Sequence, residues 1–213
     1  VKNTFDKVEK MAADPVYGWN GESNIDVHLM KNVDWGAVAY LGHSSFGKNA
    51  EVWKNPSNQY ITGCAGSSVS ASSVAGCPNA YDTTNGMQAS TTGNVYGVYD
   101  MNGGAYEVVM ANLDGIVRVS GFSDISDVAS QYLNSYVGYG DVVFGDAIYE
   151  TSSASTSNNS WYNNQSVFMD IDSPWLWRGG AHDNSNSGIF SYNKQIGAES
   201  INNYTFRPVI IAN

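Results

Sequence analysis

The chain has 213 residues and a formal net charge of −10, and only 14% of its residues are charged. The length suffices for one large domain or two small ones with a substantial core. The excess of carboxylates repels phosphate backbones, which argues against nucleic acid as a partner. No apolar run approaches the length of a membrane-spanning helix, so no membrane insertion is expected.

The first predicted element is a short helix over residues 3–15. Phe5, Val8 and Met11 recur at helical spacing, and Pro15 follows them. This spacing predicts a single apolar face that packs against the rest of the chain.

A second, longer helix is predicted over residues 26–47. Asp26 is a suitable N-terminal cap, and Gly42 or Gly47 is a suitable end. The apolar positions repeat at helical spacing and are Leu29, Met30, Val33, Ala37, Val38 and Leu41. This repeat predicts that the helix is amphipathic along its whole length.

Residues 48–92 are rich in Gly, Ser, Asn and Pro and are interpreted as loops with short strands, one of them at residues 59–62. The two cysteines, Cys64 and Cys77, flank a Ser/Gly/Ala-rich stretch here, and their spacing fits no zinc pattern. A disulfide that closes this loop is the simplest interpretation, and it would indicate an oxidising, extracytoplasmic setting. The alternative is a pair of free thiols in a cytosolic loop.

Later segments have the composition of β-strands. Residues 93–112 predict two short strands around an Asn102-Gly103-Gly104 turn, and residues 115–122 predict a further strand. Residues 175–180 and 204–212 predict core strands. The low-complexity stretch 151–166 is interpreted as an exposed insertion, and the alternative is an ordered loop held by Trp161 and Tyr162.

Between the last two predicted strands lies a polar run that is broken by Ile189-Phe190 and Ile196. Its Asn, Ser, Gly and Tyr residues are of the kind that makes adaptable contacts at low entropic cost, as in antibody loops. Held between rigid strands, the run is a candidate ligand-binding face, with His182 as a candidate contact. The alternative is a solvated loop that binds nothing.

Motifs of catalysis are absent from the sequence: it has no nucleotide-binding loop, no nucleophile elbow and no zinc-binding helix. His28 and His43 are expected to have structural roles. Asp100 and Glu107 flank the Asn-Gly-Gly turn and are candidate oxygen ligands for Ca²⁺. The alternative is a turn-capping Asp100 and a Glu107 that is buried with a partner.

Three stretches carry a family resemblance. Residues 93–112, GNVYGVYDMNGGAYEVVMAN, resemble the G-L-Y-D-M-x-G-N-V-W-E-W signature of the formylglycine-generating-enzyme (sulfatase-modifying factor) family. WRGGAHDNSNSGIF…YTFRPVI is similar to its R-G-G-S-W…G-F-R pattern, and KNVDWGAVAYL to its V-T-W-E-D-A helix. The resemblance implies an α+β, C-type-lectin-like fold, in which two helices accompany small twisted antiparallel sheets and extensive irregular loops.

The chain departs from these enzymes at chemically important positions. Gly104 replaces the Asn of the signature, Tyr106 replaces its Trp, and no cysteine follows Cys77. The enzymes carry reactive cysteines in their C-terminal third, and their iron-dependent branch needs a His cluster. We therefore expect no enzyme activity and no cofactor, with Ca²⁺ as the one metal considered.

A non-catalytic branch is more similar. The C-terminal part resembles variable proteins of diversity-generating retroelements, in which a C-type lectin scaffold presents a ligand-binding face varied by adenine-directed mutagenesis. The whole chain also resembles pilin-like surface proteins of gut Firmicutes. The scaffold positions implied by these resemblances are Arg178, Gly179, Gly180, Gly188, Phe190, Phe206 and Arg207. The implied ligand-binding positions are His182, Asp183, Ser185, Asn186, Ser191, Tyr192, Asn193, Gln195, Ile201, Asn202 and Tyr204.

Together these features predict one C-type-lectin-like domain over residues 1–213, with a loop insertion at about 124–172 and a variable ligand-binding segment at about 178–207. The expected function is extracellular ligand binding, as an adhesin or receptor-binding domain at a bacterial or phage surface, with a tether outside this chain as one option. The expected partner is an unidentified protein or glycan on a cell or phage surface. The alternatives are an unusual enzyme of the formylglycine-generating class and a structural pilin head.

Overall fold

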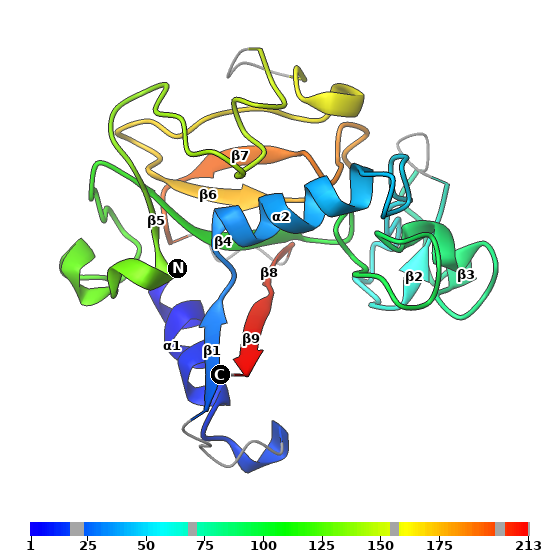
Figure 1. Ribbon diagram of the computed structural model, residues 1–213, viewed down its shortest axis with the longest axis horizontal. Coiled ribbons are helices and arrows are strands. Elements are labelled where there is room, and N and C mark those ends of the chain that lie inside the picture. The colour runs from blue at the N-terminus through cyan, green and yellow to red at the C-terminus, as the bar shows by residue number, and fades with distance from the viewer. Residues whose placement is uncertain (18–23, 68–71, 154–157, 199–202, 213) are drawn as a thin grey trace.

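The computed structural model describes residues 1–17, 24–67, 72–153, 158–198 and 203–212. The protein is of the α+β class, with α-helices α1 (Lys2–Met11) and α2 (Asn32–His43) and several small sheets (Figure 1). No helix in these ranges is long and apolar enough to cross a membrane.

Helix α1 forms where the sequence predicts it. Phe5 and Val8 are buried, as their spacing requires, and the Phe5 ring meets Phe122 edge-on with centroids 5.7 Å apart. Their neighbours in this cluster include Val27 and Leu29. The apolar face therefore attaches α1 to the strand that follows it in the chain.

The prediction of a single helix over 26–47 is wrong. Strand β1 (Ile25–Leu29) occupies the first part, where it pairs antiparallel with β9 (Pro208–Ala212), and α2 begins only at Asn32. Backbone hydrogen bonds to a strand at the far end of the chain decide this conformation, and local periodicity cannot reveal them. The helix ends at His43, so neither predicted glycine marks its end.

Helix α2 buries a face that was not predicted, in which small residues lie beside Trp35. The buried positions are Asn32, Trp35, Gly36, Ala39 and Gly42, whereas Leu41 is 55% exposed. A Cβ added at Gly36 would overlap the carbonyl oxygen of Gly145. The missing side chain thus allows the helix to lie directly on residues 145–146.

The main sheet has the strand order β5-β4-β6-β7, with β8 beside β4. Its strands are β4 (Tyr106–Leu113), β5 (Asn134–Tyr136), β6 (Trp175–Arg178), β7 (Tyr192–Gln195) and β8 (Tyr204–Phe206). β4, β6 and β7 pair antiparallel as expected, whereas β5 and β8 pair parallel to β4, which the prediction of antiparallel sheets did not include. Figure 1 shows α2 crossing in front of β4 and β6.

Several predicted strands do not form. The stretches 59–62, 94–100 and 115–122 have no strand conformation, and only β4 of the predicted hairpin exists. Left-handed residues interrupt all three stretches, namely Tyr60 (φ 52°), Asp100 (φ 58°) and Arg118 (φ 47°).

The loop region between α2 and β4 carries the remaining small sheet. Strands β2 (Cys64–Ala65) and β3 (Asn79–Ala80) pair antiparallel beside the 3₁₀ helix η2 (Gly86–Ala89). Cys64 and Cys77 form a disulfide, which confirms that prediction.

The segment 124–172 contributes to the core. Its buried apolar residues are Val128, Leu133, Tyr136, Ala147, Ile148, Phe168 and Met169. Its elements besides β5 are the 3₁₀ helices η3 (Ile125–Asp127), η4 (Ser130–Tyr132) and η5 (Trp161–Asn163); a further one, η1 (Pro15–Tyr17), follows α1. The part of 151–166 that the structure describes is an ordered loop in which Trp161 packs on Phe190, so the alternative interpretation fits it better than an exposed insertion. Residues 154–157 lie outside the described part.

Of the two predicted core strands, only one is buried. Every residue of β6 is buried. By contrast, β8 and β9 are largely exposed, and Ile210 and Ile211 retain 49% and 44% of their surface. β9 pairs with β1 instead of the main sheet, and therefore lies outside its core.

His28 lies buried between two carboxylates, in agreement with the predicted structural role. Its Nδ1 is 2.9 Å from Asp26 Oδ2, its Nε2 is 3.5 Å from Asp34 Oδ2, and its ring stacks on Tyr132. The Asp34 carboxylate beside Nε2, opposed by burial and reinforced by Asp26, raises the pKa of His28. Protonated His28 therefore links β1 to α2.

This arrangement predicts a pH-dependent contribution to stability. Because the folded-state pKa of His28 is raised, its contribution is fully present below the unfolded-state pKa of about 6.5 and is lost as the pH rises through the folded-state value. We expect His28→Gln to lower the free energy of unfolding more at about pH 5 than at about pH 9. Urea unfolding of both proteins at the two pH values measures this difference. An equal loss at both would show that the imidazolium contributes nothing.

Candidate ligand-binding surface

Hydrogen bonds from buried side chains hold the backbone of the loop between β6 and β7. Buried Lys54 donates from Nζ to the carbonyl of Asn184 at 3.0 Å, and Asn184 Oδ1 accepts the amide of Asn186 at 2.9 Å. Buried Ser187 donates to the carbonyl of Ala181 at 2.6 Å. The loop is thus fixed by groups that do not face solvent.

The predicted ligand-binding residues divide by exposure. Asp183 and Ser185 are exposed, and four more are partly exposed: His182, Asn186, Asn193 and Tyr204. We call these six residues the recognition surface. Ile201 and Asn202 lie outside the described residues.

Three predicted contact residues are instead buried: Ser191, Tyr192 and Gln195. Pairing with β6 and residue alternation along β7 turn Tyr192 inward, where its hydroxyl lies 2.6 Å from Ser152 Oγ. Ser191 Oγ donates to the carbonyl of Asn186, and Gln195 Nε2 to that of Leu176. These three side chains lie beneath the surface of the protein, so the prediction that they contact a ligand directly is wrong.

Aromatic side chains border the recognition surface. The ring of Tyr106 lies 3.8 Å from that of Trp177 and 5.7 Å from that of Tyr204, centroid to centroid. Asn193 is paired with Trp177 in the sheet and so shares this face. This stack gives the exposed positions a rigid apolar support.

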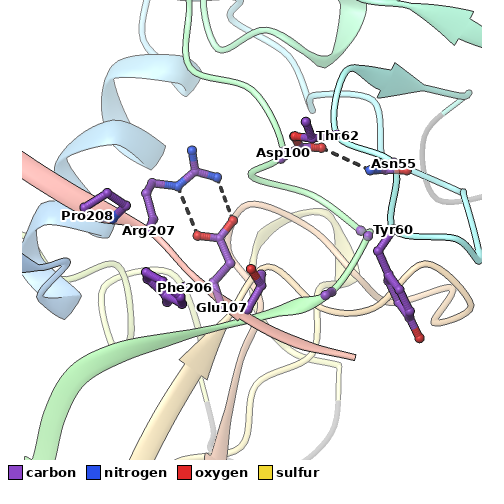
Figure 2. Close-up of a pocket in the computed structure, with 12 residues that line it drawn as sticks. Asn55, Tyr60, Thr62, Asp100, Glu107, Phe206, Arg207 and Pro208 are labelled. Carbon is purple, nitrogen blue, oxygen red and sulfur yellow. Dashed lines mark hydrogen bonds and ion pairs between the residues drawn. The ribbon is translucent and has the colours of Figure 1, made fainter. Parts of the chain in front are cut away.

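A pocket of about 280 Å³ opens beside the recognition surface. Its lining residues are Asn55, Tyr60, Thr62, Asp100, Gly103, Gly104, Ala105, Glu107, Thr205, Phe206, Arg207 and Pro208. Figure 2 shows Tyr60 and Phe206 on opposite sides of this pocket, with Glu107 and Arg207 on the same side as Phe206. The His182 amide donates to the Gly104 carbonyl at 2.9 Å, which joins the pocket to the surface.

Glu107 and Arg207 form an ion pair in the pocket. Arg207 Nη2 is 2.6 Å from Glu107 Oε1, and Arg207 Nε is 3.0 Å from Oε2. Burial lowers the pKa of Arg207, but the charge and hydrogen bonds of Glu107 outweigh it and raise the pKa overall. Burial raises the pKa of Glu107, and the adjacent guanidinium opposes this rise. The two hydrogen bonds tie residue 207, which directly follows β8, to β4.

Asp100 is held by uncharged donors. Its carboxylate accepts hydrogen bonds from Tyr81, from Thr62 Oγ1 at 2.6 Å and from Asn55 Nδ2 at 3.2 Å. Burial, together with the negative charge of Asp100, raises the pKa of Tyr81, so that its hydroxyl remains a donor.

The structure therefore brings the two candidate Ca²⁺ ligands into one pocket but pairs each with protein groups. The alternative interpretation of Glu107, as a buried residue with a partner, is confirmed. Across the described ranges, no group of three or more His, Cys, Asp or Glu side chains is placed to hold a metal ion.

Sequence reasoning missed the pocket residues between α2 and β4. Asn55, Tyr60 and Thr62 come from the stretch interpreted as loops with a strand at 59–62. The one available signal was an aromatic residue in a Gly/Pro/Asn-rich segment.

The other histidine with a predicted structural role, His43, contacts the Tyr162 hydroxyl through Nδ1 at 2.6 Å.

No protein-family model matches the chain, and no curated protein matches it.

Proposed function

We propose that the chain is an extracellular recognition domain with a C-type-lectin-like fold, which binds a protein or glycan ligand of a bacterial or phage surface through the recognition surface and without catalysis. The observation that carries the proposal is the contrast within the loop 181–187. Its backbone is fixed by buried Lys54 and Ser187, while Asp183 and Ser185 project into solvent. Such a loop presents side chains without needing them for folding.

Further features support the proposal. The two helices, the small sheets and the long irregular segments are features that the resemblance implies. Both cysteines of the chain are joined in a disulfide, which favours an oxidising compartment. The same disulfide leaves no thiol for the oxidation chemistry of the formylglycine-generating enzymes.

Removing the exposed side chains tests the proposal. We expect a variant with His182→Ala, Asp183→Ala, Ser185→Ala and Asn193→Ala to lose ligand binding. The changes at the exposed residues Asp183 and Ser185 should each alter the free energy of unfolding by no more than about 0.5 kcal/mol. Binding is measured with the tetramerised chain on arrays of glycans and of extracellular proteins, and stability by urea unfolding.

The control variant carries alanine at four exposed positions elsewhere: Lys7, Glu9, Lys10 and Gln131. It should bind as the wild type does. If the control loses binding and the surface variant retains it, the ligand binds elsewhere and the proposal is wrong.

A further inference from the structure

The pocket beside the recognition surface has a chemistry of its own. The ring of Tyr60 meets the ring of His182 edge-on, with centroids 5.0 Å apart, and Gly104 in the pocket wall accepts the His182 amide. A ligand seated on His182 therefore reaches the pocket. The inference about this pocket rests on the proposed function, because the group that enters the pocket is taken to be part of the same ligand.

We infer that the pocket receives a cationic side chain of the ligand, a lysine ammonium or an arginine guanidinium. Its charged lining residues are Asp100, Glu107 and Arg207, so two negative charges and one positive charge leave a net charge of −1. Glu107 and Arg207 neutralise each other at 2.6 Å. Asp100 is hydrogen-bonded to neutral groups and takes part in no salt bridge among the described residues.

The position of Asp100 makes its charge effective. The residue is half-buried, and the surrounding protein screens its field less than bulk water would. The charge of Arg207 also acts on Asp100. Its Nε and Nη2, however, donate to Glu107, and Nη2 donates further to the carbonyl of Tyr99 at 3.0 Å. An entering cation therefore gains from Asp100, whereas an anion meets two carboxylates.

Two aromatic rings complete the site. Tyr60 and Phe206 remain 37% and 36% exposed, and they flank the pocket from opposite sides (Figure 2). Tyr60 presents its ring from a left-handed backbone conformation with φ 52°, which a non-glycine residue adopts only when its surroundings impose it. A cation between such rings is attracted by their π-electron faces.

Size and overall charge favour the same ligand. A space of about 280 Å³ admits the end of one long side chain and excludes a helix. The net charge of −10 attracts cationic partners over longer distances.

The test is an NMR titration of the full chain at low ionic strength with Nα-acetyl-lysine methylamide. Its uncharged counterpart is Nα-acetyl-norleucine methylamide, and methyl mannoside represents a neutral sugar. We expect the lysine probe to shift the amide signals of Gly103, Gly104 and Thr205, and added salt to weaken it. The other two probes should leave these signals unchanged.

Two variants assign the binding to the pocket. Asp100→Asn should weaken the lysine probe about ten-fold, since a hydrogen-bonded charge is lost. Tyr60→Leu, at an exposed ring, should weaken it about three-fold through loss of the cation–π contact. Asp172→Asn, which removes an exposed carboxylate outside the pocket, should have no effect. If Asp100→Asn does not fold, Tyr60→Leu and the salt dependence decide.

Equal binding of the norleucine or mannoside probe, or unchanged lysine binding in the pocket variants, would overturn the inference. Because the probes need no macromolecular partner, the two proposals fail separately. If the surface variant loses array binding but the lysine probe leaves the pocket signals unmoved, only the cation site is wrong. If the probe binds in the pocket but array binding survives the surface variant, only the recognition surface is wrong.

Discussion

Phe190→Ala is expected to lower the free energy of unfolding by about 3–5 kcal/mol, because the ring is fully buried and its removal leaves a cavity. The ring packs against Trp161 at 5.0 Å and His43 at 5.8 Å between centroids. The Phe190 amide also donates to Asn164 Oδ1 at 3.0 Å. Phe190 thus anchors the loop between β6 and β7 to α2 and to the loop around η5. Urea unfolding measures how much this packing contributes to stability.

The matched control is Phe46→Ala. Phe46 is 88% exposed, so the same substitution there should change the free energy of unfolding by no more than about 0.5 kcal/mol. Similar effects at the two positions would mean that Phe190 does not anchor the segment.

Arg178→Ala is expected to cost about as much, roughly 3–5 kcal/mol, because it leaves buried acceptors of Asn32, Asp146 and Ala147 without a donor and opens a cavity. Arg178 is fully buried and donates to Asn32 Oδ1 at 3.2 Å and to the carbonyls of Asp146 and Ala147. Burial lowers the pKa of Arg178 to about 10, against the attraction of Asp146. The guanidinium therefore remains charged at neutral pH and joins β6 to α2.

The matched control here is Arg118→Ala. Arg118 pairs with Asp172 at 2.9 Å, but both side chains are largely exposed, and such a pair contributes about 0–1 kcal/mol. Thermal or urea unfolding of the two variants should differ clearly. If Arg178→Ala lowers the free energy of unfolding no more than Arg118→Ala does, the buried hydrogen bonds of Arg178 do not stabilise the fold.

The sequence predicted the elements whose conformation depends on local pattern. Helix α1 forms because Phe5 and Val8 share a face, and β6 forms as a buried apolar run. Residues 25–29 form a strand against a helical pattern because β9, which lies 179 to 187 positions away in the paired register, supplies its hydrogen bonds. No local signal reports a partner at that distance.

The candidate site was likewise predictable only where it depends on local sequence pattern. The buried Ile189-Phe190 pair and the exposure of Asp183 and Ser185 follow from the polar run. The burial of Tyr192 follows from its register with Arg178 in the sheet, which the sequence does not specify. The pocket also needs Tyr60 beside His182, a contact between loops that only the folded chain brings together.

The central claim is that a rigid scaffold carries the recognition surface. Its most direct test is a phage-displayed library randomised at His182, Asp183, Ser185, Asn186, Asn193 and Tyr204, challenged with protease and then selected on lysozyme as a test protein. A control library varies six exposed positions elsewhere: Lys7, Glu9, Lys10, Ser123, Ser130 and Gln131.

The measurement is the fraction of each library that survives protease and the number of distinct lysozyme binders selected from the survivors. We predict that most members of both libraries survive, because exposed side chains contribute little to stability, and that binders arise from the recognition surface alone. Loss of protease resistance in the first library, or equal numbers of binders from both, would contradict the account.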